Sequence, residues 1–186
     1  MEYRKLDKLG ISVSLLGFGC MRFPTKDGKI DEELSFEMID EAIKNGVNYL
    51  DTAYPYHNGE SESFVGKVLK KYDREKLYIA TKLPCWEVKS VDDAKKIFDK
   101  QLENLGVDYI DFYLLHSLGK NSYNKMVELG VVDFCQKLKD EGKIKYFGFS
   151  FHDDYSAFEK ILTDRPWDFC QIQLNYMDTD YQAGMA

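Results

Sequence analysis

The sequence lacks the features of several large protein classes. No apolar run reaches the length of a membrane span, and the first residues, MEYRKLDKLGISV, lack the apolar core of a signal peptide. The formal net charge is −7 at pH 7 and there is no basic block, which disfavours nucleic acid and anionic membranes as partners. We therefore expect a cytoplasmic protein that binds neither nucleic acid nor a membrane.

Paired cysteines of the kind found in metal and redox motifs are also lacking. The four cysteines are far apart and form no C-x-x-C pair: Cys20, Cys85, Cys135 and Cys170. This spacing supports neither a disulfide framework nor a metal site, so we expect reduced thiols that are buried or half-buried. The run His152–Asp154 is interpreted as a turn and helix cap, and no metal site is predicted.

The sequence does contain a regular alternation of apolar runs and amphipathic stretches. Its 186 residues are 44% apolar and 15% aromatic, which indicates one globular domain over residues 1–186. A short N-terminal hairpin that turns at Gly10 is expected first. Six apolar runs are then typical of buried strands: residues 15–19, 47–51, 77–82, 109–116, 144–150 and 167–175.

Helices are predicted between these strands from apolar residues at helical spacing and from signals at the helix ends. Asp31 is expected to cap a helix that ends at Gly46. Leu34 and Met38 would form part of its apolar face. Further helices are expected at four places: from Ser61, from Ser90, before Gly142 and around Ile161.

A strand followed by a helix, repeated, predicts an α/β fold whose usual closed form is the eight-stranded (β/α)8 TIM barrel. Such a barrel typically needs about 250 residues, so a chain that stops at Ala186 is expected to be an incomplete barrel of about six βα units, truncated at the C-terminus. The alternative is an open, doubly wound sheet. That fold usually carries a glycine-rich phosphate turn after its first strand, and the stretch CMRFPTKDGK lacks one.

Four polar residues stand at or just beyond the ends of three successive predicted strands. Asp51, Lys82 and His116 each close a strand, and Tyr56 lies in the loop after Asp51. Ligands bind at the carboxyl edge of such parallel sheets. An acid, a phenol, an amine and an imidazole at that edge predict a proton-transfer site. Each residue taken alone also fits an ordinary turn, packing or surface role.

The four residue types suit the reduction of a carbonyl group. A phenol is a weak acid at neutral pH, and a neighbouring ammonium makes it a better proton donor. Lys82 could supply that charge and Asp51 could hold Lys82, while His116 donates to a carbonyl oxygen. Tyr56 would protonate that oxygen as a hydride reaches the carbon. Side chains do not donate hydride, so a nicotinamide cofactor is expected.

Five segments resemble the successive signatures of the aldo/keto reductase family: DTAYPYHNGESE, TKLPCW, YLLHS, YFGFSFHD and FCQIQLNYMD. The resemblance runs over essentially the whole chain in the order of the family. It implies a TIM barrel that reduces aldehydes or ketones with NADP(H). It also implies that the family's catalytic tetrad falls on Asp51, Tyr56, Lys82 and His116, with Tyr56 as the general acid.

The resemblance further implies four cofactor-binding positions: Met21, Asp51, Ser150 and Gln171. Ser150 and Gln171 would hold the nicotinamide carboxamide, and Met21 would lie along the nicotinamide ribose. The family's usual asparagine after that serine is Phe151 here.

Two aromatic residues follow predicted strands and are interpreted in two ways. Trp86 and Phe23 could form walls of a pocket for a small carbonyl substrate, or they could be ordinary loop packing. The substrate itself is not indicated by the sequence.

The phrases GFGCMRFP, DTAYPYH and FSFHDD most resemble a subgroup with a C-terminal ferredoxin-like extension. Its iron–sulfur cysteines are absent from this sequence, so a cluster is expected only in such an extension. The phosphate-holding loops after strands seven and eight are absent too. A regulatory barrel with little turnover and an inactive fragment of a reductase therefore stay open as alternatives. Open sheet edges at residues 15–19 and 169–175 would favour self-association.

Overall fold

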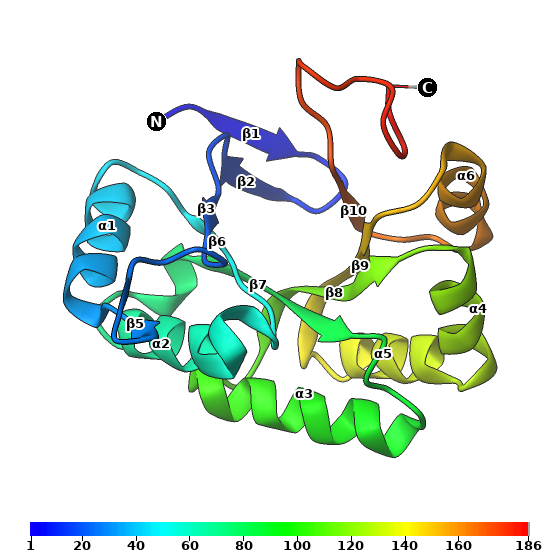
Figure 1. The fold of residues 1–186 in the computed structure, drawn as a ribbon, viewed down its shortest axis with the longest axis horizontal. Helices are drawn as coiled ribbons and strands as arrows, with labels where there is room; N and C mark the ends of the chain where they lie inside the picture. The colour runs from blue at the N-terminus through cyan, green and yellow to red at the C-terminus, as the bar shows by residue number, and fades with distance from the viewer. Residues whose placement is uncertain (186) are drawn as a thin grey trace. The chain divides into compact units, whose positions relative to one another are not determined.

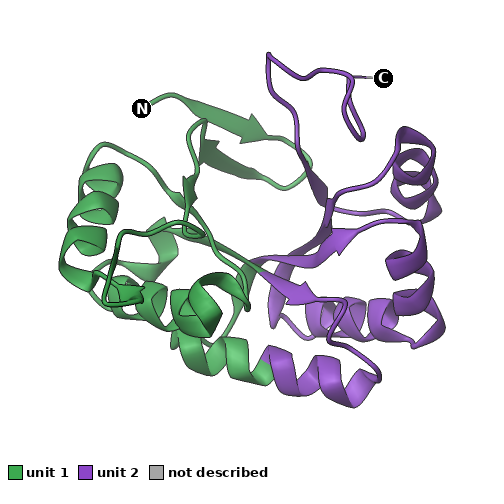
Figure 2. Ribbon diagram, in the orientation of Figure 1, with its two compact units in different colours: residues 1–81, 99–111 green, residues 82–98, 112–186 purple. Residues whose placement is uncertain are grey.

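The computed structural model describes residues 1–185, and the chain divides into two compact units (Figure 2). Unit 1 comprises residues 1–81 and 99–111. Unit 2 comprises residues 82–98 and the residues from 112 onwards. The division falls inside two strands and one helix, so these elements contribute residues to both units.

Unit 1 contains the N-terminal part of the strand–helix repeat (Figure 1). Its complete elements are β1 (Tyr3–Leu6), β2 (Ile11–Ser14), β3 (Phe18–Gly19), β4 (Thr25–Lys26), β5 (Lys29–Ile30), α1 (Glu32–Lys44), β6 (Tyr49–Asp51), η1 (Tyr56–Gly59), α2 (Glu60–Leu69) and η2 (Arg74–Lys76). It also includes the first residues of β7 (Tyr78–Pro84) and β8 (Ile110–Leu118), and the last residues of α3 (Val91–Leu105).

Unit 2 continues the repeat from the end of β7 (Figure 1). Its complete elements are α4 (Lys120–Glu128), α5 (Val131–Asp140), β9 (Ile144–Phe151), α6 (Tyr155–Asp164) and β10 (Phe169–Ile172). Among the described residues of either unit, no helix combines the length and the apolar character that crossing a membrane requires.

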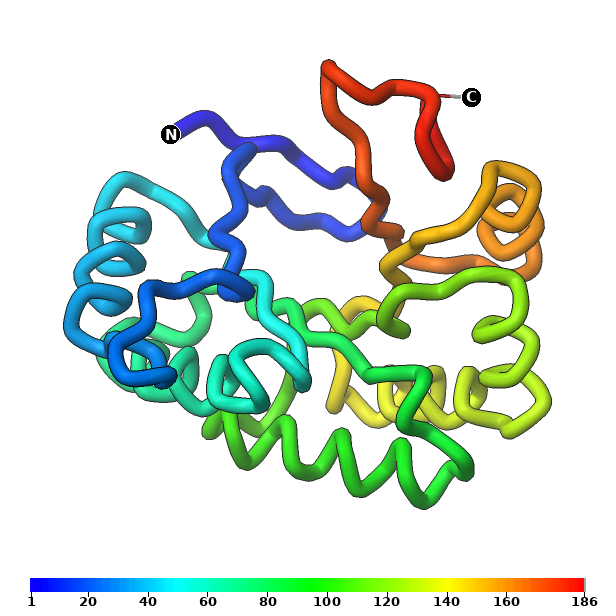
Figure 3. The backbone as a smooth tube through the Cα atoms, in the orientation of Figure 1, coloured from blue at the N-terminus to red at the C-terminus, as the bar shows by residue number. Residues whose placement is uncertain are grey.

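The main sheet has the hydrogen-bonded strand order β10-β9-β8-β7-β6-β3. In unit 1, β6 pairs in parallel with β3 on one side and with β7 on the other. In unit 2, β9 and β10 are parallel neighbours. The hairpins β1–β2 and β4–β5 are separate antiparallel pairs, and Figure 3 traces the chain from the first hairpin through β3 to the second.

Several local predictions are confirmed. The N-terminal hairpin forms and turns at Gly10, whose φ of 69° suits glycine. Asp31 caps α1, because its carboxylate accepts a hydrogen bond from the Leu34 N–H at 3.2 Å. The glycine that ends this helix, Gly46, has a φ of 94°. Each of the six predicted strand runs overlaps a strand of the main sheet, although β7, β8 and β9 extend one or two residues beyond their runs.

The predicted apolar face of α1 is wrong at Leu34 and Met38. Leu34 and Met38 are 44% and 42% exposed, whereas Ser35 and Ile39 are fully buried. The two pairs lie one residue apart, which is a rotation of about 100° around the helix axis. Ser35 lies one helical turn before Ile39, so the two share a face, and sequence spacing alone does not distinguish this face from that of Leu34 and Met38.

The first predicted strand is also shorter than expected. Only Phe18 and Gly19 are in β3, while Leu15 and Leu16 are 53% and 61% exposed. The Leu15 N–H bonds back to the carbonyl oxygen of Glu2, so this part of the run belongs to the end of the first hairpin and not to the core.

A helix, a hairpin and the two short helices η1 and η2 were not predicted from the sequence. α4 has only two buried residues, Tyr123 and Met126, so its apolar periodicity is weak. The hairpin β4–β5 turns at Asp27 and Gly28, which both have positive φ values of 52° and 78°. An Asp-Gly pair is a strong signal for such a two-residue turn, and it could have revealed this hairpin.

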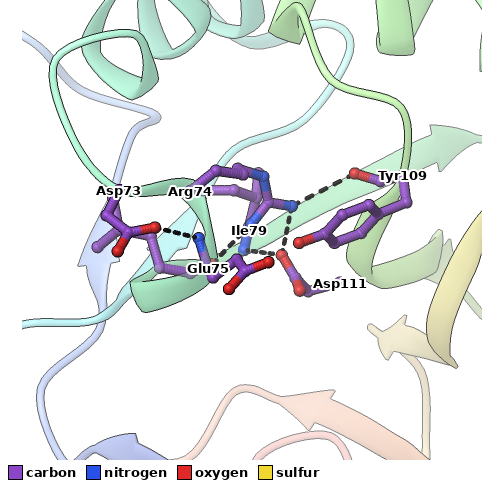
Figure 4. A network of polar contacts seen from close by, with 7 residues as sticks. Asp73, Arg74, Glu75, Ile79, Tyr109 and Asp111 are labelled. Carbon is purple, nitrogen blue, oxygen red and sulfur yellow. Dashed lines mark hydrogen bonds and ion pairs between the residues drawn. The ribbon is translucent and has the colours of Figure 1, made fainter.

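A buried ion pair joins the starts of β7 and β8 in unit 1 (Figure 4). The Arg74 guanidinium lies 2.5 Å from the Asp111 carboxylate, and Asp111 is 1% exposed. Asp111 also accepts the Ile79 N–H at 3.0 Å, while Arg74 donates to the carbonyl oxygen of Tyr109 and stacks on its ring. This network fixes the strand ends that lie away from the predicted catalytic residues of the same strands.

Candidate active site

Asp51 closes β6 and points away from the helix that covers this strand in unit 1. Its neighbour Thr52 is fully buried, and the Thr52 hydroxyl oxygen lies 2.9 Å from that of Ser61 in α2. Successive side chains of an extended chain point to opposite faces. Thr52 therefore faces α2, and the half-buried Asp51 faces the other side of the sheet.

Tyr56 begins a turn with unusual backbone geometry. The three residues that follow it, His57, Asn58 and Gly59, have φ values of 51°, 53° and 88°. A left-handed backbone is costly for a histidine, and a compensating contact is expected. That contact is a 2.9 Å hydrogen bond from the Phe23 N–H to Nε2 of His57. The bond ties the loop after β3 to the turn that carries Tyr56.

Phe23 and Met21 lie on that loop in different environments. Phe23 is 5% exposed, and its ring packs edge-on against Phe64 of α2 with centroids 4.9 Å apart. Met21 is 53% exposed and so is accessible to a ligand. The packing of Phe23 accounts for most of its ring surface, and a role as a pocket wall stays a prediction.

Lys82 is a lysine buried inside a strand, with only 2% of its surface exposed. The preceding residue, Thr81, donates its hydroxyl hydrogen to Glu62 of α2 at 2.6 Å. Thr81 thus faces the helices, and by alternation Lys82 points to the opposite face of β7. A lysine is almost never fully buried unless its charge is compensated, so this position is typical of a functional amine.

His116 is half-buried in β8 and lies beside Trp86 in unit 2. The two ring centroids are 5.1 Å apart, and Trp86 is 53% exposed. Burial, followed by the positive charges of Lys82 and His152, lowers the pKa of His116 from 6.5 to about 3. His116 is therefore a neutral imidazole at physiological pH. Tyr113 of the same strand packs on Phe98 of α3, so His116, three residues on, faces the other side.

Ser150 and Gln171 lie at the same level of two adjacent strands. They are register partners in the parallel pair β9–β10, so their side chains leave the same face of the sheet. Ser150 is 5% exposed, and its hydroxyl oxygen accepts the Ser117 N–H at 2.8 Å. Ser117, directly after His116, has a φ of 56°. Ser117 thus connects the His116 strand end to Ser150.

The two residues after Ser150 have separate roles. Phe151, which stands where the family's asparagine is usual, is 1% exposed and packs on Phe158 of α6 with ring centroids 5.3 Å apart. It therefore supplies no polar contact. His152 is exposed, and its Nδ1 lies 3.1 Å from the side-chain oxygen of Gln182. The predicted cap is Asp154, which accepts the Ala157 N–H at 2.9 Å.

The predicted site residues are thus distributed over the two units. Unit 1 contains Asp51 and Tyr56 together with Met21 and Phe23. Unit 2 contains the other candidates: Lys82, Trp86, His116, Ser150 and Gln171. The meeting of all four tetrad side chains stays a prediction. Ser117 was missed by sequence reasoning, because its positive φ and its bond to Ser150 depend on the folded backbone.

The cysteines agree with the sequence interpretation. Cys20, Cys85 and Cys135 are buried free thiols, and Cys170 is half-buried. Burial raises the pKa of Cys85 to about 12 and also raises that of Cys135, so neither is a reactive thiolate. Among residues 1–185, no cluster of histidine, cysteine and acidic side chains is arranged to hold a metal ion.

A separate hollow of about 680 Å³ lies in unit 1 between the β4–β5 hairpin and the start of α2. None of the predicted site residues lines it. Its lysines, Lys26, Lys29 and Lys67, are matched by carboxylates in the same wall, and Lys67 is paired with Glu32 at 2.5 Å. This charge balance gives no indication of a particular ligand.

Comparison with known proteins identifies the family to which this geometry corresponds. The family model described as "Aldo/keto reductase family" matches residues 15–185. L-galactose dehydrogenase of Arabidopsis thaliana is 33% identical over 156 residues, covering 80% of this chain and 48% of that protein. The NADH-specific methylglyoxal reductase of Escherichia coli (strain K12) is 32% identical over 191 aligned positions, covering 93% of this chain and 56% of that protein.

Solved structures give the same result. The holo form of aldo-keto reductase AKR11C1 from Bacillus halodurans matches 94% of this chain and 58% of its own, with a TM-score of 0.77 and 32% identity. The thermostable aldo-keto reductase Tm1743 matches 97% of this chain and 65% of its own, with a TM-score of 0.74 and 27% identity. The predicted fold class, an incomplete TIM barrel, is confirmed, and the doubly wound alternative is excluded. The chain spans about half the length of the curated relatives it matches.

Proposed function

The chain belongs to the aldo/keto reductase family, and we propose that it reduces aldehydes or ketones to alcohols with NADP(H). The observation that carries this proposal is the half-buried His116 beside the exposed Trp86, in the same unit as the buried Lys82. A neutral imidazole can donate one hydrogen bond to a carbonyl oxygen without transferring its proton. A purely structural histidine does not need an adjacent exposed aromatic ring or a nearby buried lysine.

Each tetrad residue has a distinct role in this proposal. His116 donates its N–H to the carbonyl oxygen of the substrate and orients it. Tyr56 transfers its phenolic proton to that oxygen as general acid. The ammonium of Lys82 stabilises the phenolate that remains, and Asp51 keeps Lys82 charged and in place. The nicotinamide, when bound, supplies the hydride.

The side chains of β9 and β10 fit a nicotinamide carboxamide. Because Ser150 already accepts the Ser117 N–H, its hydroxyl hydrogen is directed toward another acceptor, as a carboxamide oxygen would be. Gln171, on the same face in register, offers both an amide donor and an acceptor. Met21 would lie along the nicotinamide ribose, and Asp51 would border the nicotinamide. Parallel titrations with NADPH and NADH measure which of the two cofactors the protein prefers.

The substrate is proposed to be a small carbonyl compound. Trp86 offers an exposed ring beside His116 for the apolar part of such a molecule. Phe23 is proposed as a second wall, through the small part of its ring that is not packed against Phe64. One relative is named a methylglyoxal reductase and another an L-galactose dehydrogenase. Methylglyoxal is therefore the first substrate to test.

We also propose that the protein works in the cytoplasm without nucleic-acid or membrane partners, and that its terminal sheet strands favour self-association. An iron–sulfur cluster is proposed only for a parent protein with a C-terminal extension.

Fluorescence titration with NADPH and NADH, followed by a reduction assay with methylglyoxal, tests the function. Binding with turnover supports the proposed reductase. Binding without turnover would favour a regulatory barrel that holds the cofactor. The absence of both would favour an inactive fragment and overturn the proposal for this chain.

A further inference from the structure

The first turn of α2 contains a carboxylate in an unusual position. Glu62 is fully buried, whereas its neighbour Glu60 in the same turn is exposed. Acidic residues in the first turn of a helix usually lie in water and interact favourably with the helix dipole. That role explains Glu60 but not Glu62, because burying a carboxylate is costly unless several donors compensate it.

Three side chains from two other elements of unit 1 donate to Glu62. Its Oε1 accepts the Thr81 hydroxyl at 2.6 Å and the Gln101 amide at 2.8 Å. Its Oε2 accepts the Asn104 amide at 3.2 Å. Glu62 therefore joins α2 to β7 and to α3. A group with two acceptor oxygens is required here. If a glutamine kept its oxygen toward Thr81 and Gln101, its NH2 group would face the NH2 group of Asn104, and neither could accept.

The adjacent residue in α2 makes a second set of anchoring contacts. The Ser61 hydroxyl donates to the carbonyl oxygen of Cys20 at 2.8 Å and lies 2.9 Å from the Thr52 hydroxyl oxygen. The Cys20 N–H in turn donates to the Asp51 carbonyl oxygen at 2.7 Å. The same helical turn is thus bonded to the ends of β3 and β6 and to β7.

The anchored residues are sequence neighbours of the proposed catalytic ones. Thr52 directly follows Asp51, and Thr81 directly precedes Lys82. Each threonine faces α2, so its catalytic neighbour faces the other side of the sheet. Fixing the threonine side chain fixes the adjacent peptide planes, and these set the direction in which the catalytic side chain leaves the strand.

We infer that Glu62 is a positioning residue for Lys82, acting through Thr81, and that Ser61 does the same for Asp51 through Thr52. This inference rests on the proposed reductase function. Glu62 does not touch the reacting atoms. It holds the β7 backbone so that the Lys82 ammonium occupies the place where it assists Tyr56.

The test compares Glu62→Gln with the double variant Glu62→Gln/Asn104→Asp. The single variant places two amide donors against each other, and the second substitution restores an acceptor while keeping the net charge. We expect Glu62→Gln to lower kcat for NADPH-dependent methylglyoxal reduction by about 10-fold to 100-fold with little change in the KM for NADPH, since small misplacements have effects of this order. The double variant should recover most of that loss. Glu60→Gln, which removes a charge from the same turn, is the matched control and should behave as wild type.

A readout that does not depend on turnover separates failure of the inference from failure of the proposed function. The acylation rate of Lys82 by an amine-reactive reagent, measured by mass spectrometry, should rise in Glu62→Gln and return toward wild type in the double variant. The exposed Lys29 is the internal reference. If the wild-type chain has no reductase activity, the function fails and this labelling still tests the positioning.

Thr81→Val and Thr81→Ser provide a second pair should Glu62→Gln not fold. Valine removes the donor to Glu62, whereas serine keeps it, so only Thr81→Val should lower kcat and increase Lys82 labelling. A Glu62→Gln or Thr81→Val protein with a lowered melting temperature but unchanged kcat and unchanged Lys82 labelling would overturn the inference, because Glu62 would then serve stability alone.

Discussion

The hydroxyl oxygen of Ser150 accepts a hydrogen bond from the backbone N–H of Ser117 at 2.8 Å. This bond links the residue that follows His116 to a residue proposed to hold the cofactor. It also orients the Ser150 hydroxyl hydrogen, which is left to donate to an acceptor outside the pair.

Replacing Ser150 by alanine should weaken cofactor binding. The loss of one neutral hydrogen bond corresponds to about 0.5–1.5 kcal/mol, or about 2-fold to 10-fold in the dissociation constant. The variant should also be less stable than wild type, because the half-buried Ser117 N–H loses its acceptor. Titration of NADPH fluorescence measures the first effect and urea unfolding the second. Ser12→Ala, at an exposed position of β2, is the control. Equal affinities of Ser150→Ala and wild type would remove Ser150 from the cofactor site.

His116 should make the protein less stable as the pH falls below about 6.5. Its pKa is lowered from 6.5 to about 3 in the folded chain, so between these values the unfolded chain binds more protons than the folded one. The contribution of His116 to stability is fully present above pH 6.5 and is lost progressively as the pH falls toward 3.

His116→Gln should remove this dependence. The difference in unfolding free energy between variant and wild type, measured by urea unfolding at a series of pH values, should be constant above neutral pH and should change in favour of the variant as the pH falls. A difference that is independent of pH from 4 to 8 would show that His116 titrates normally in the folded protein.

The ion pair of Arg74 and Asp111 should be important for the stability of unit 1. Arg74→Ala leaves the Asp111 carboxylate buried without its guanidinium partner, and removing one partner of a buried pair typically costs about 3–5 kcal/mol. Lys5→Ala breaks an exposed pair with Asp7 and should change stability by less than about 1 kcal/mol. Urea unfolding of both variants measures the difference. Similar small losses in both would mean that the Arg74 network is not structurally required.

The terminal strands of the main sheet should promote self-association. β3 and β10 stand at the two ends of the hydrogen-bonded order, and unpaired strand edges tend to pair with other chains. Ile172→Lys places a charge on β10 and should reduce association, whereas Met177→Lys adds the same charge at an exposed site outside the sheet. Light scattering over a range of concentrations measures the mass. A monodisperse monomer of the wild-type chain at every concentration would contradict this prediction.

The strands were predictable because their signals are local. Buried parallel strands are continuous apolar runs, so polar residues such as Lys82 and His116 are conspicuous within them, although β7 and β8 each extend two residues beyond these positions. The buried face of α1 was not predictable in the same way. Ser35 and Leu34 are equally compatible with the helical period, and only packing in the folded chain decides which of them is buried.

The supporting residues were less accessible to sequence reasoning. By residue type and position, Glu62 resembles an exposed acid in the first turn of a helix. Its burial depends on hydrogen-bond donors that lie on β7 and α3. Those residues come close because α2 and α3 pack tightly at Gly66, where an added Cβ would lie 2.5 Å from the Asn104 carbonyl oxygen. Such a contact joins residues that are distant in the sequence, so no local sequence pattern predicts it.

The central claim is that Tyr56 acts as the general acid of a carbonyl reduction, and the most direct test is the turnover of Tyr56→Phe. The rate of NADPH oxidation with methylglyoxal should fall by about 10²-fold or more relative to wild type, since general-acid catalysis contributes at that order. NADPH affinity and thermal stability should remain near those of wild type, because phenylalanine keeps the ring and loses only the hydroxyl. Tyr54→Phe, in the same loop, is the matched control. Turnover by Tyr56→Phe at the wild-type rate would contradict the account.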